Sequence, residues 1–407
     1  MARPKAEKRT VTSVTPAEIA PSPPADRFAE LYDVAQEWFY QPDHQALRVL
    51  LGAMKAHYLS LGDPAWLFVV APPGTGKTTL GIMGAASLPE VVLLGGFTAC
   101  TFLSGFYGRK EPGLLEKLGQ TTQDRRTFTT IGNAILLAKD FTTVLAMRRE
   151  TRSEVLGQLR EIHDGEYKRN FGTGETKIWR GRVTIIAAVT PIIDRYYSIF
   201  SVLGERFLQL RWHRPDSPEA GQRAIQQQGS EDVIRRELRT TIGNLFGGSG
   251  DSTPKLSSRA ERRLASLAEL VAIARTHVIR GNYGSREIEY VPEAEANTRI
   301  SKGLAAIAKG IAALSGKKSV TEQDLQDAFR VALDSIQDTR RKVLLPIVQG
   351  RALDTFGLPR TVAIREIEEL QALGLITGDR PCRLTDAKAE LLEAADIVVD
   401  GVPLLKS

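Results

Sequence analysis

Residues 71–78 read Ala71-Pro72-Pro73-Gly74-Thr75-Gly76-Lys77-Thr78. This stretch directly follows the apolar run 66–70 and opens a segment with helical character. Glycines in such a loop let backbone N–H groups close around phosphate oxygens, and the N-terminus of the following helix adds partial positive charge. Strand, glycine-rich loop and helix in this order form the context that a Walker A motif requires. We therefore expect residues 73–79 (Pro73, Gly74, Thr75, Gly76, Lys77, Thr78 and Thr79) to bind a nucleoside triphosphate.

Two side chains of this loop have specific expected roles. Lys77 would reach the β- and γ-phosphates, and the Thr78 hydroxyl would hold Mg²⁺. The first position of the motif is Ala71 where the usual pattern has glycine. A small residue there still permits the turn.

Composition places the chain among globular proteins. Of its 407 residues, 42% are hydrophobic and 25% are charged, which excludes wholesale disorder. No apolar run approaches the roughly 18 residues that span a bilayer, and the N-terminus has no secretory signal, so we expect a cytoplasmic protein. The two cysteines are too few for a disulfide framework. A net charge of +6 permits an acidic partner, but only weakly indicates one.

Four short apolar runs, separated by helical stretches, indicate an α/β fold. They are residues 66–70, 90–94, 134–138 and 183–188. Continuous apolar runs are typical of parallel strands that are buried on both faces, so we expect a parallel sheet with helices on both sides. The expected units are a flexible tail (1–28), an α/β nucleotide-binding domain (29–215), a helical unit (216–335) and a C-terminal unit (336–407).

The C-terminal unit resembles a winged helix. Its expected order is three helices, the last at 361–373, and a hairpin of 375–377 with 382–384. The helix 361–373 stands at the recognition position, but Arg365 is outnumbered there by Glu366, Glu368 and Glu369. DNA contact and protein docking are therefore both open for this unit.

The order of motifs resembles that of the AAA+ ATPases over residues 45–335. The segment 135–140 is similar to a Walker B strand that ends in Asp140, which would bind the Mg²⁺ hydration shell. The segment 185–190 is similar to a sensor 1 strand that ends in Thr190. Arg206, followed by Phe207, resembles an arginine finger, and Arg299 resembles sensor 2 at the start of a lid helix.

This resemblance implies a set of partners. ATP and Mg²⁺ are the expected cofactors, and ATP would bind between two subunits because the finger would act on a neighbouring subunit. A homo-oligomeric ring, typically a hexamer, is therefore implied. Arg211 competes with Arg206 for the role of finger, and we prefer Arg206 because it adjoins the phenylalanine and does not lie in an apparent strand.

Between Asp140 and Thr190 the sequence predicts a helix at 153–163 and a hairpin at 166–180. This resembles the AAA+ clade with a hairpin inserted here, which includes MCM-type helicases, MoxR-type chaperones and enhancer-binding activators. The C-terminal winged helix looks most like the MCM arrangement. Lys168, Arg169, Lys177 and Arg180 of the hairpin could follow phosphates while its aromatic residues stack on bases. A solvated hairpin that packs on its own domain is the structural alternative.

Phe141 departs from the family pattern. It stands after Asp140, where the family has the glutamate that polarises the attacking water. Either another acid such as Glu150 replaces it, or hydrolysis is slow. We expect an ATP-dependent DNA motor of the helicase or translocase type, acting in replication, with DNA as partner. The alternatives are a slowly hydrolysing, nucleotide-gated loader or switch and a MoxR-like protein-remodelling chaperone.

Overall fold

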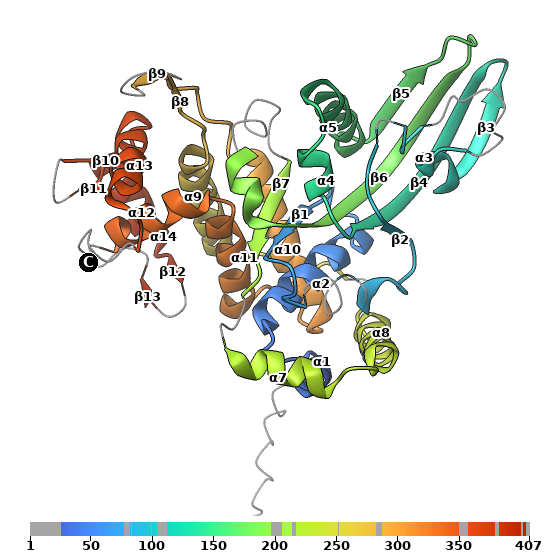
Figure 1. The fold of residues 1–407 in the computed structure, drawn as a ribbon, viewed down its shortest axis with the longest axis horizontal. Helices are drawn as coiled ribbons and strands as arrows, with labels where there is room; N and C mark the ends of the chain where they lie inside the picture. The colour runs from blue at the N-terminus through green and yellow to red at the C-terminus, as the bar shows by residue number, and fades with distance from the viewer. Residues whose placement is uncertain are drawn as a thin grey trace, which may run out of the picture.

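The computed structural model describes residues 26–76, 82, 84–98, 100–103, 112–196, 206–213, 217–250, 252–281, 287–349, 357–378, 382–399 and 402–403. Its centre is a mostly parallel sheet with strands in the order β2-β4-β6-β1-β7. The bounds of these strands are β1 Trp66–Val70, β2 Val91–Leu94, β4 Thr127–Ala138, β6 Thr176–Val189 and β7 Phe207–Arg211. Helices surround this sheet, which confirms the expected α/β class (Figure 1).

The central strands are buried on both faces because their residues alternate between two hydrophobic clusters. Leu67 and Val69 of β1 belong to one cluster, and Trp66, Phe68 and Val70 belong to the other. The same alternation runs through the end of β4. This explains why the sequence shows continuous apolar runs here and no polar alternation.

The helices fall into an N-terminal pair, a set beside the sheet and a long C-terminal series. The first two groups are α1 Ala29–Trp38, α2 His44–Tyr58, α3 Leu114–Lys117, α4 Thr142–Leu145, α5 Arg149–His163 and the 3₁₀ helix η2 Pro191–Tyr196. The third is α7 Pro218–Gln226, α8 Glu231–Gly247, α9 Ser258–Ala274, α10 Thr298–Leu314, α11 Glu322–Asp334, α12 Asp338–Val348, α13 Arg360–Ala372 and α14 Asp386–Ala395. None of the described helices is long and apolar enough to cross a membrane.

Small antiparallel pairs complete the chain. Within the predicted helical unit 216–335, β8 Ile279–Arg280 pairs with β9 Ile288–Tyr290, so that unit is not entirely helical. Further on, β10 Ile376–Thr377 pairs with β11 Arg383–Leu384, and β12 Val398–Val399 pairs with β13 Val402–Pro403. The pairing of β10 with β11 lies where the hairpin of the C-terminal unit was expected.

Helix α10 packs directly on α2, and the contact depends on two glycines. A Cβ added at Gly310 would lie 1.9 Å from the carbonyl oxygen of Gly52. Residues of α2, α10 and α11 belong to the same hydrophobic cluster as one face of β1. The predicted boundary at 215/216 therefore does not separate two hydrophobic cores. Phe28, which was predicted to lie in the tail, is also fully buried in this cluster.

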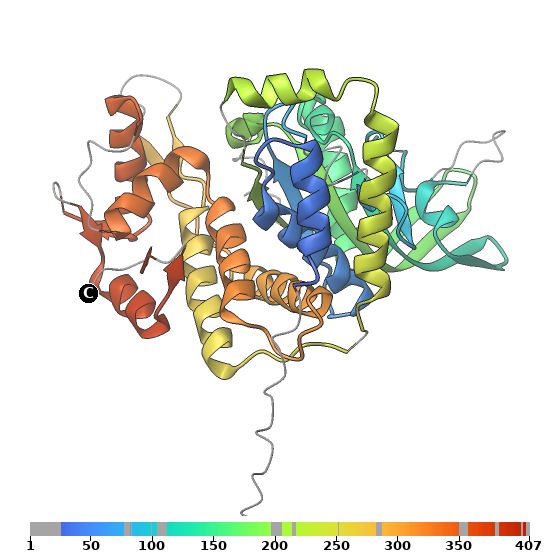
Figure 2. The ribbon, with the colours of Figure 1, turned by 90° about the horizontal axis from the view of Figure 1, so that it is seen from below.

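Two hairpins form an arm that projects from the sheet. Strand β3 Gln120–Asp124 pairs with β4, β5 Glu166–Asn170 pairs with β6, and β4 and β6 pair with each other. Figures 1 and 2 show this four-stranded arm at one end of the molecule and α12–α14 at the other. The hairpin β5–β6 follows the predicted 166–180 segment, whereas sequence analysis did not predict β3–β4.

A row of glycines crosses the arm at its base. Gly132 pairs with Gly181, Gly119 lies against Gly132, and the N–H of Gly181 donates to the carbonyl of Gly165 at 3.1 Å. A Cβ added at Gly132 would lie 2.3 Å from the carbonyl oxygen of Leu118. Backbones approach this closely only without side chains, so the four glycines permit the arm to leave the sheet here.

Candidate functional site

The glycine-rich loop lies at the carboxyl end of β1, where ligands of open α/β sheets bind. The N–H of Ala71 donates to the carbonyl of Val189 on β6 at 3.1 Å, which fixes the start of the loop. Gly74 and Gly76 both have φ of +78°, a conformation that favours glycine. A Cβ at Gly74 would meet nothing within 4 Å, so its backbone faces open space. The described part of the loop thus fits a phosphate group, while Lys77, Thr78 and Thr79 lie outside the described residues.

The surroundings of the loop include residues that the motif search did not single out. A Cβ at Gly76 would lie 3.0 Å from the ring of Phe39, which follows α1. Beside it, an open groove of about 780 Å³ at the carboxyl end of β7 is lined by the segment 41–45, by Arg211, Trp212 and His213, and by α11 and α12. This groove borders the loop because the N–H of Trp212 donates to the carbonyl of Val70. It has room for the nucleoside part of a nucleotide.

Asp140 and Thr190 lie together at the same edge of the sheet. Asp140 follows β4 and Thr190 follows β6, and both side chains are partly buried. Thr142 links them, since its N–H donates to Asp140 Oδ1 at 2.8 Å and its hydroxyl lies 3.4 Å from that of Thr190. The strand that carries Thr190 stands between those that carry the loop and Asp140. These three sequence-predicted elements are therefore brought to one edge.

Phe141 points away from this edge and into the core. Its side chain is fully buried, with its ring centroid 4.9 Å from that of Phe68 and 5.6 Å from that of Phe97. A glutamate at this position would be buried in an apolar cluster and would not face the loop. Glu150, the suggested replacement, has an exposed side chain in the first turn of α5.

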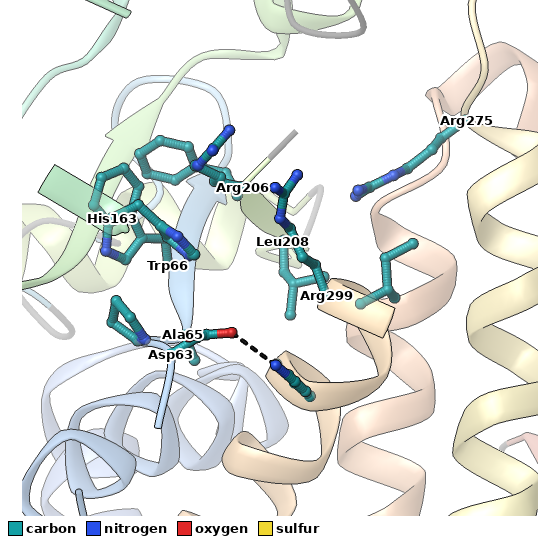
Figure 3. A pocket seen from close by; sticks show the side chains of 13 residues that line it. Asp63, Ala65, Trp66, His163, Arg206, Leu208, Arg275 and Arg299 are labelled. Carbon is teal, nitrogen blue, oxygen red and sulfur yellow. Dashed lines mark hydrogen bonds and ion pairs between the residues drawn. The ribbon is translucent and has the colours of Figure 1, made fainter. Parts of the chain in front are cut away.

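Arg206 and Arg299 lie at the opposite, amino edge of the sheet. Arg206 precedes β7, Arg299 is in the first turn of α10, and both line a pocket beside Trp66 at the start of β1. Figure 3 shows them in the same hollow as Arg275, which comes from the end of α9. Arg275 is a third arginine of this edge that sequence reasoning missed, because only the packing of α9 on α10 and α11 brings it there.

The two edges are separated by the length of β1, five residues or about 16 Å. Arg206 and Arg299 therefore do not lie beside the loop of their own chain. A role for either in contacting nucleotide requires a second chain whose loop edge meets this amino edge. This applies to Arg299 as well as to Arg206, although only Arg206 was predicted to act on a neighbour.

Arg206 is held by Asp164, which lies at the end of α5. Two hydrogen bonds from Arg206 Nη2 reach the Asp164 oxygens at 2.9 and 3.1 Å. Partial burial alone would raise the pKa of Asp164, but the hydrogen bonds and the positive charge of Arg206 lower it below its ordinary value. The pair is thus ionised at neutral pH, and the Arg206 side chain is only 9% exposed.

Arg211, the competing candidate for a finger, is engaged within its own chain. It forms a bidentate ion pair with Asp194 at 2.8 and 2.9 Å and donates to the carbonyls of Asp334 and Ile336. Its Asp194 partner raises the pKa of Arg211 despite a burial effect in the other direction. These contacts fix η2 and the turn after α11 to the carboxyl edge, which is a structural role.

The arm divides the four predicted DNA-contacting residues between its two faces. One face of the arm, here called the open face, carries Ile131, which is 65% exposed. On this face Lys168 pairs with Ile178, and Arg180 pairs with Ile131. Arg169 and Lys177 pair with each other on the other face, beside the buried Trp179 and Tyr167. Lys177 is also bound to Glu116 at 2.7 Å and Arg169 lies 3.5 Å from Glu154. The open face therefore offers Lys168 and Arg180, with Arg180 paired to the exposed Glu166.

Comparison with known proteins finds no protein family and no curated protein that this chain matches. The function of the site is therefore inferred from its residues and their geometry.

Proposed function

We propose that the chain is an ATPase of the AAA+ type that works as a homo-oligomer and acts on DNA. The observation that carries this proposal is the division of polar residues between the two edges of the sheet. The loop, Asp140 and Thr190 lie at the carboxyl edge, and Arg206 and Arg299 lie at the amino edge. Each chain would supply one half of a nucleotide site to each of two neighbours.

The residues of the carboxyl edge suit Mg²⁺ and ATP. Backbone N–H groups around Gly74 and Gly76 would surround the phosphates, and Lys77 would contact the β- and γ-phosphates. Thr78 and Asp140 would hold the hydrated Mg²⁺. Thr190, at the sensor 1 position, would place its hydroxyl beside the bound nucleotide. Bound Mg²⁺ would neutralise charge that develops on the phosphate oxygens.

The finer division of the chain is part of this proposal. We assign residues 216–335 to an AAA+ lid and residues 336–407 to a winged helix. The packing of α10 on α2 supports a lid that is held firmly against the sheet. The order α12, α13 and the β10–β11 hairpin supports the winged helix. The middle one of its three expected helices, at 353–356, lies outside the described residues.

The arm is the element we assign to single-stranded DNA. On its open face Lys168 and Arg180 flank Ile131 and Ile178, and the hydroxyls of Thr122 and Thr129 lie in the same register row as Lys168. Hydroxyl, lysine and arginine side chains are the usual contacts to phosphate oxygens. Since β4 and β6 run from this arm to Asp140 and Thr190, the nucleotide and DNA sites share two strands.

The buried position of Phe141 favours a second candidate, a nucleotide-gated switch that hydrolyses ATP slowly. Phe141, which follows Asp140, has no carboxylate that could orient water, and its side chain belongs to the core. Such a switch would bind ATP and DNA through the same residues as the motor. Turnover, rather than binding, distinguishes the two.

The test is steady-state ATP hydrolysis by the purified protein with and without single-stranded DNA. Lys77→Ala is the control for the loop, and the variant Lys168→Ala/Arg180→Ala removes the open-face charges. Arg262→Ala/Lys318→Ala removes equivalent exposed charges from the helical region. We expect DNA to stimulate a Lys77-dependent rate severalfold, and only the arm variant to lose the stimulation.

Other outcomes separate the alternatives. ATP binding with turnover no faster than that of Lys77→Ala would replace the motor with the switch. Hydrolysis that depends on Lys77 but ignores DNA would favour protein remodelling. Absence of ATP binding would contradict the whole proposal.

A further inference from the structure

Helix α13 follows α12 and precedes the β10–β11 hairpin in the chain, and in the proposed winged helix it stands at the recognition position. In DNA-binding proteins of this kind the recognition helix enters the major groove. The sequence argues against such a role because α13 carries Glu366, Glu368 and Glu369. Three carboxylates beside phosphates would repel DNA.

All three glutamates are paired with arginines of other elements, and two of them, Glu366 and Glu369, lie on the inner side of the helix. Arg340 of α12, only 1% exposed, bonds Glu366 at 3.2 Å and Glu369 at 2.5 Å. Arg280 of β8 bonds Glu369 at 2.7 Å and Glu368 at 3.0 Å. Glu366 and Glu369 are themselves buried. The acidic residues therefore attach α13 to the rest of the molecule.

The outer side of α13 carries basic and neutral residues together with Glu368, whose charge is paired with Arg280. Arg360, Thr361 and Arg365 are exposed, and Thr361 and Arg365 lie one turn apart on the same face. Arg383 of the adjacent hairpin is also exposed, with 74% of its side chain accessible. Its neighbour Asp386 lies 4.0 Å away, and Glu368, half exposed, is bound to Arg280. The outward charge near Arg360 and Arg365 is thus positive.

We propose that this face, formed by Arg360, Thr361 and Arg365, binds duplex DNA. A helix of 13 residues is about 20 Å long, and a major groove about 12 Å wide admits it. The arginines would contact phosphates or guanine edges, with Thr361 on a phosphate. The inference depends on the proposed function only in taking DNA as the partner, since this site is separate from both the arm and the nucleotide loop.

The test is fluorescence anisotropy of a labelled duplex oligonucleotide without nucleotide, at about 50 mM and about 150 mM salt. The full-length protein is compared with Arg360→Ala/Arg365→Ala and with Arg236→Ala/Arg262→Ala, which removes two exposed arginines from α8 and α9. All four positions are exposed, so the variants should keep the fold, which thermal melting checks. We expect the α13 variant to lose at least about tenfold in duplex affinity and to show a weaker dependence on salt. The control should bind as the native chain does.

Single-stranded DNA gives the second readout. Its stimulation of hydrolysis should survive in the α13 variant, because the arm is unchanged. Equal losses in both arginine variants would overturn the proposal, as would an unchanged duplex affinity. If the native protein binds no duplex DNA, the proposal is wrong. Docking of a protein is then the remaining role for this face of α13. The duplex-binding measurements do not depend on ATP turnover, so failure here is distinguishable from failure of the ATPase proposal.

Discussion

The two edges of the central sheet differ in the kind of polar group that they present. The carboxyl edge presents backbone and short side chains, with the loop at Gly74 and Gly76 and the linked pair Asp140 and Thr190. The amino edge holds long cationic side chains: the exposed Arg299, Arg206 bound to Asp164, and the buried Arg275 bound to Glu295. The first set suits phosphate and Mg²⁺, and the second suits the charge of a phosphoryl group in transfer.

In the proposed function, neither edge makes a complete site. The distance of about 16 Å across β1 is too long for an arginine side chain at one edge to reach a phosphate at the other. A second copy of the chain, placed with its carboxyl edge against the amino edge of the first, would complete both. The strands between the edges serve as the rigid spacer.

The largest expected effect tests the amino edge. Arg206→Ala should lower ATP hydrolysis by about a thousandfold or more, because a finger that acts from a neighbouring subunit contributes this much to turnover. ATP affinity, measured by titration with a fluorescent analogue, should be nearly unchanged. If Arg206→Ala lowered ATP affinity as much as ATP hydrolysis, Arg206 would belong to the nucleotide site of its own chain. The two edges would then not have separate roles.

The next prediction concerns Phe141 beside the carboxyl edge. Phe141→Glu should reduce the free energy of unfolding by about 4 kcal/mol or more, because it places a charge in an apolar cluster. Phe141→Leu should cost only about 1 kcal/mol. Urea denaturation measures both. A folded Phe141→Glu protein with faster turnover would show that the position faces the nucleotide after all.

Predictions from sequence succeeded where burial was complete. Strand β1 has the expected bounds because a continuous apolar run can only be a buried strand in this setting. The polar halves of β4 and β6, and all of β3, carry threonines, glutamines and charges without a clear period. Their pairing as an arm is therefore invisible to hydrophobic patterning, apart from the glycine-containing turn at 172–174.

The candidate site was predictable to the same degree. Gly74, Gly76, Asp140 and Thr190 follow strands, and the carboxyl ends of parallel strands must lie at one edge. The direction of Phe141 and the edge reached by Arg299 depend on tertiary packing. Arg299 lies at the amino edge because α10 is fixed on α2 through Gly52 and Gly310, and no local pattern encodes this contact.

His57 of α2 lies against β6 near the amino edge of the sheet and gives a pH-dependent prediction. Its ring contacts Thr184 at 3.0 Å and Glu90 at 3.3 Å, and burial, with a smaller effect of Arg182, lowers its pKa to about 4. The unfolded chain binds a proton near pH 6.5 and the folded chain does not, so stability falls as pH drops from about 6.5 towards 4.

The size of this effect is up to about 3 kcal/mol. In urea denaturation at a series of pH values, His57→Gln should flatten the decline that the native chain shows over that interval. Parallel pH profiles for the two proteins would mean that the pKa of His57 is not lowered, and that its surroundings are more open than its burial indicates.

The smallest predicted effect concerns the glycine row at the base of the arm. Gly132→Ala should cost about 2 kcal/mol, because its Cβ would lie 2.3 Å from the Leu118 carbonyl oxygen. Gly157→Ala in α5 is the matched control, since its Cβ would meet nothing within 4 Å and alanine favours the helix. Thermal melting compares them, and a Gly132→Ala protein as stable as the native chain would show that the arm does not need this close approach.

Mixing two inactive variants tests most directly whether the two edges complete one site between copies. Lys77→Ala disables the loop edge and Arg206→Ala disables the arginine edge, and each protein alone should hydrolyse almost no ATP. When the two are mixed, some interfaces bring the intact loop of one protein to the intact Arg206 of the other. The account predicts that the mixture regains measurable hydrolysis that rises with protein concentration. A mixture as inactive as its components, although the variants assemble together, would contradict it.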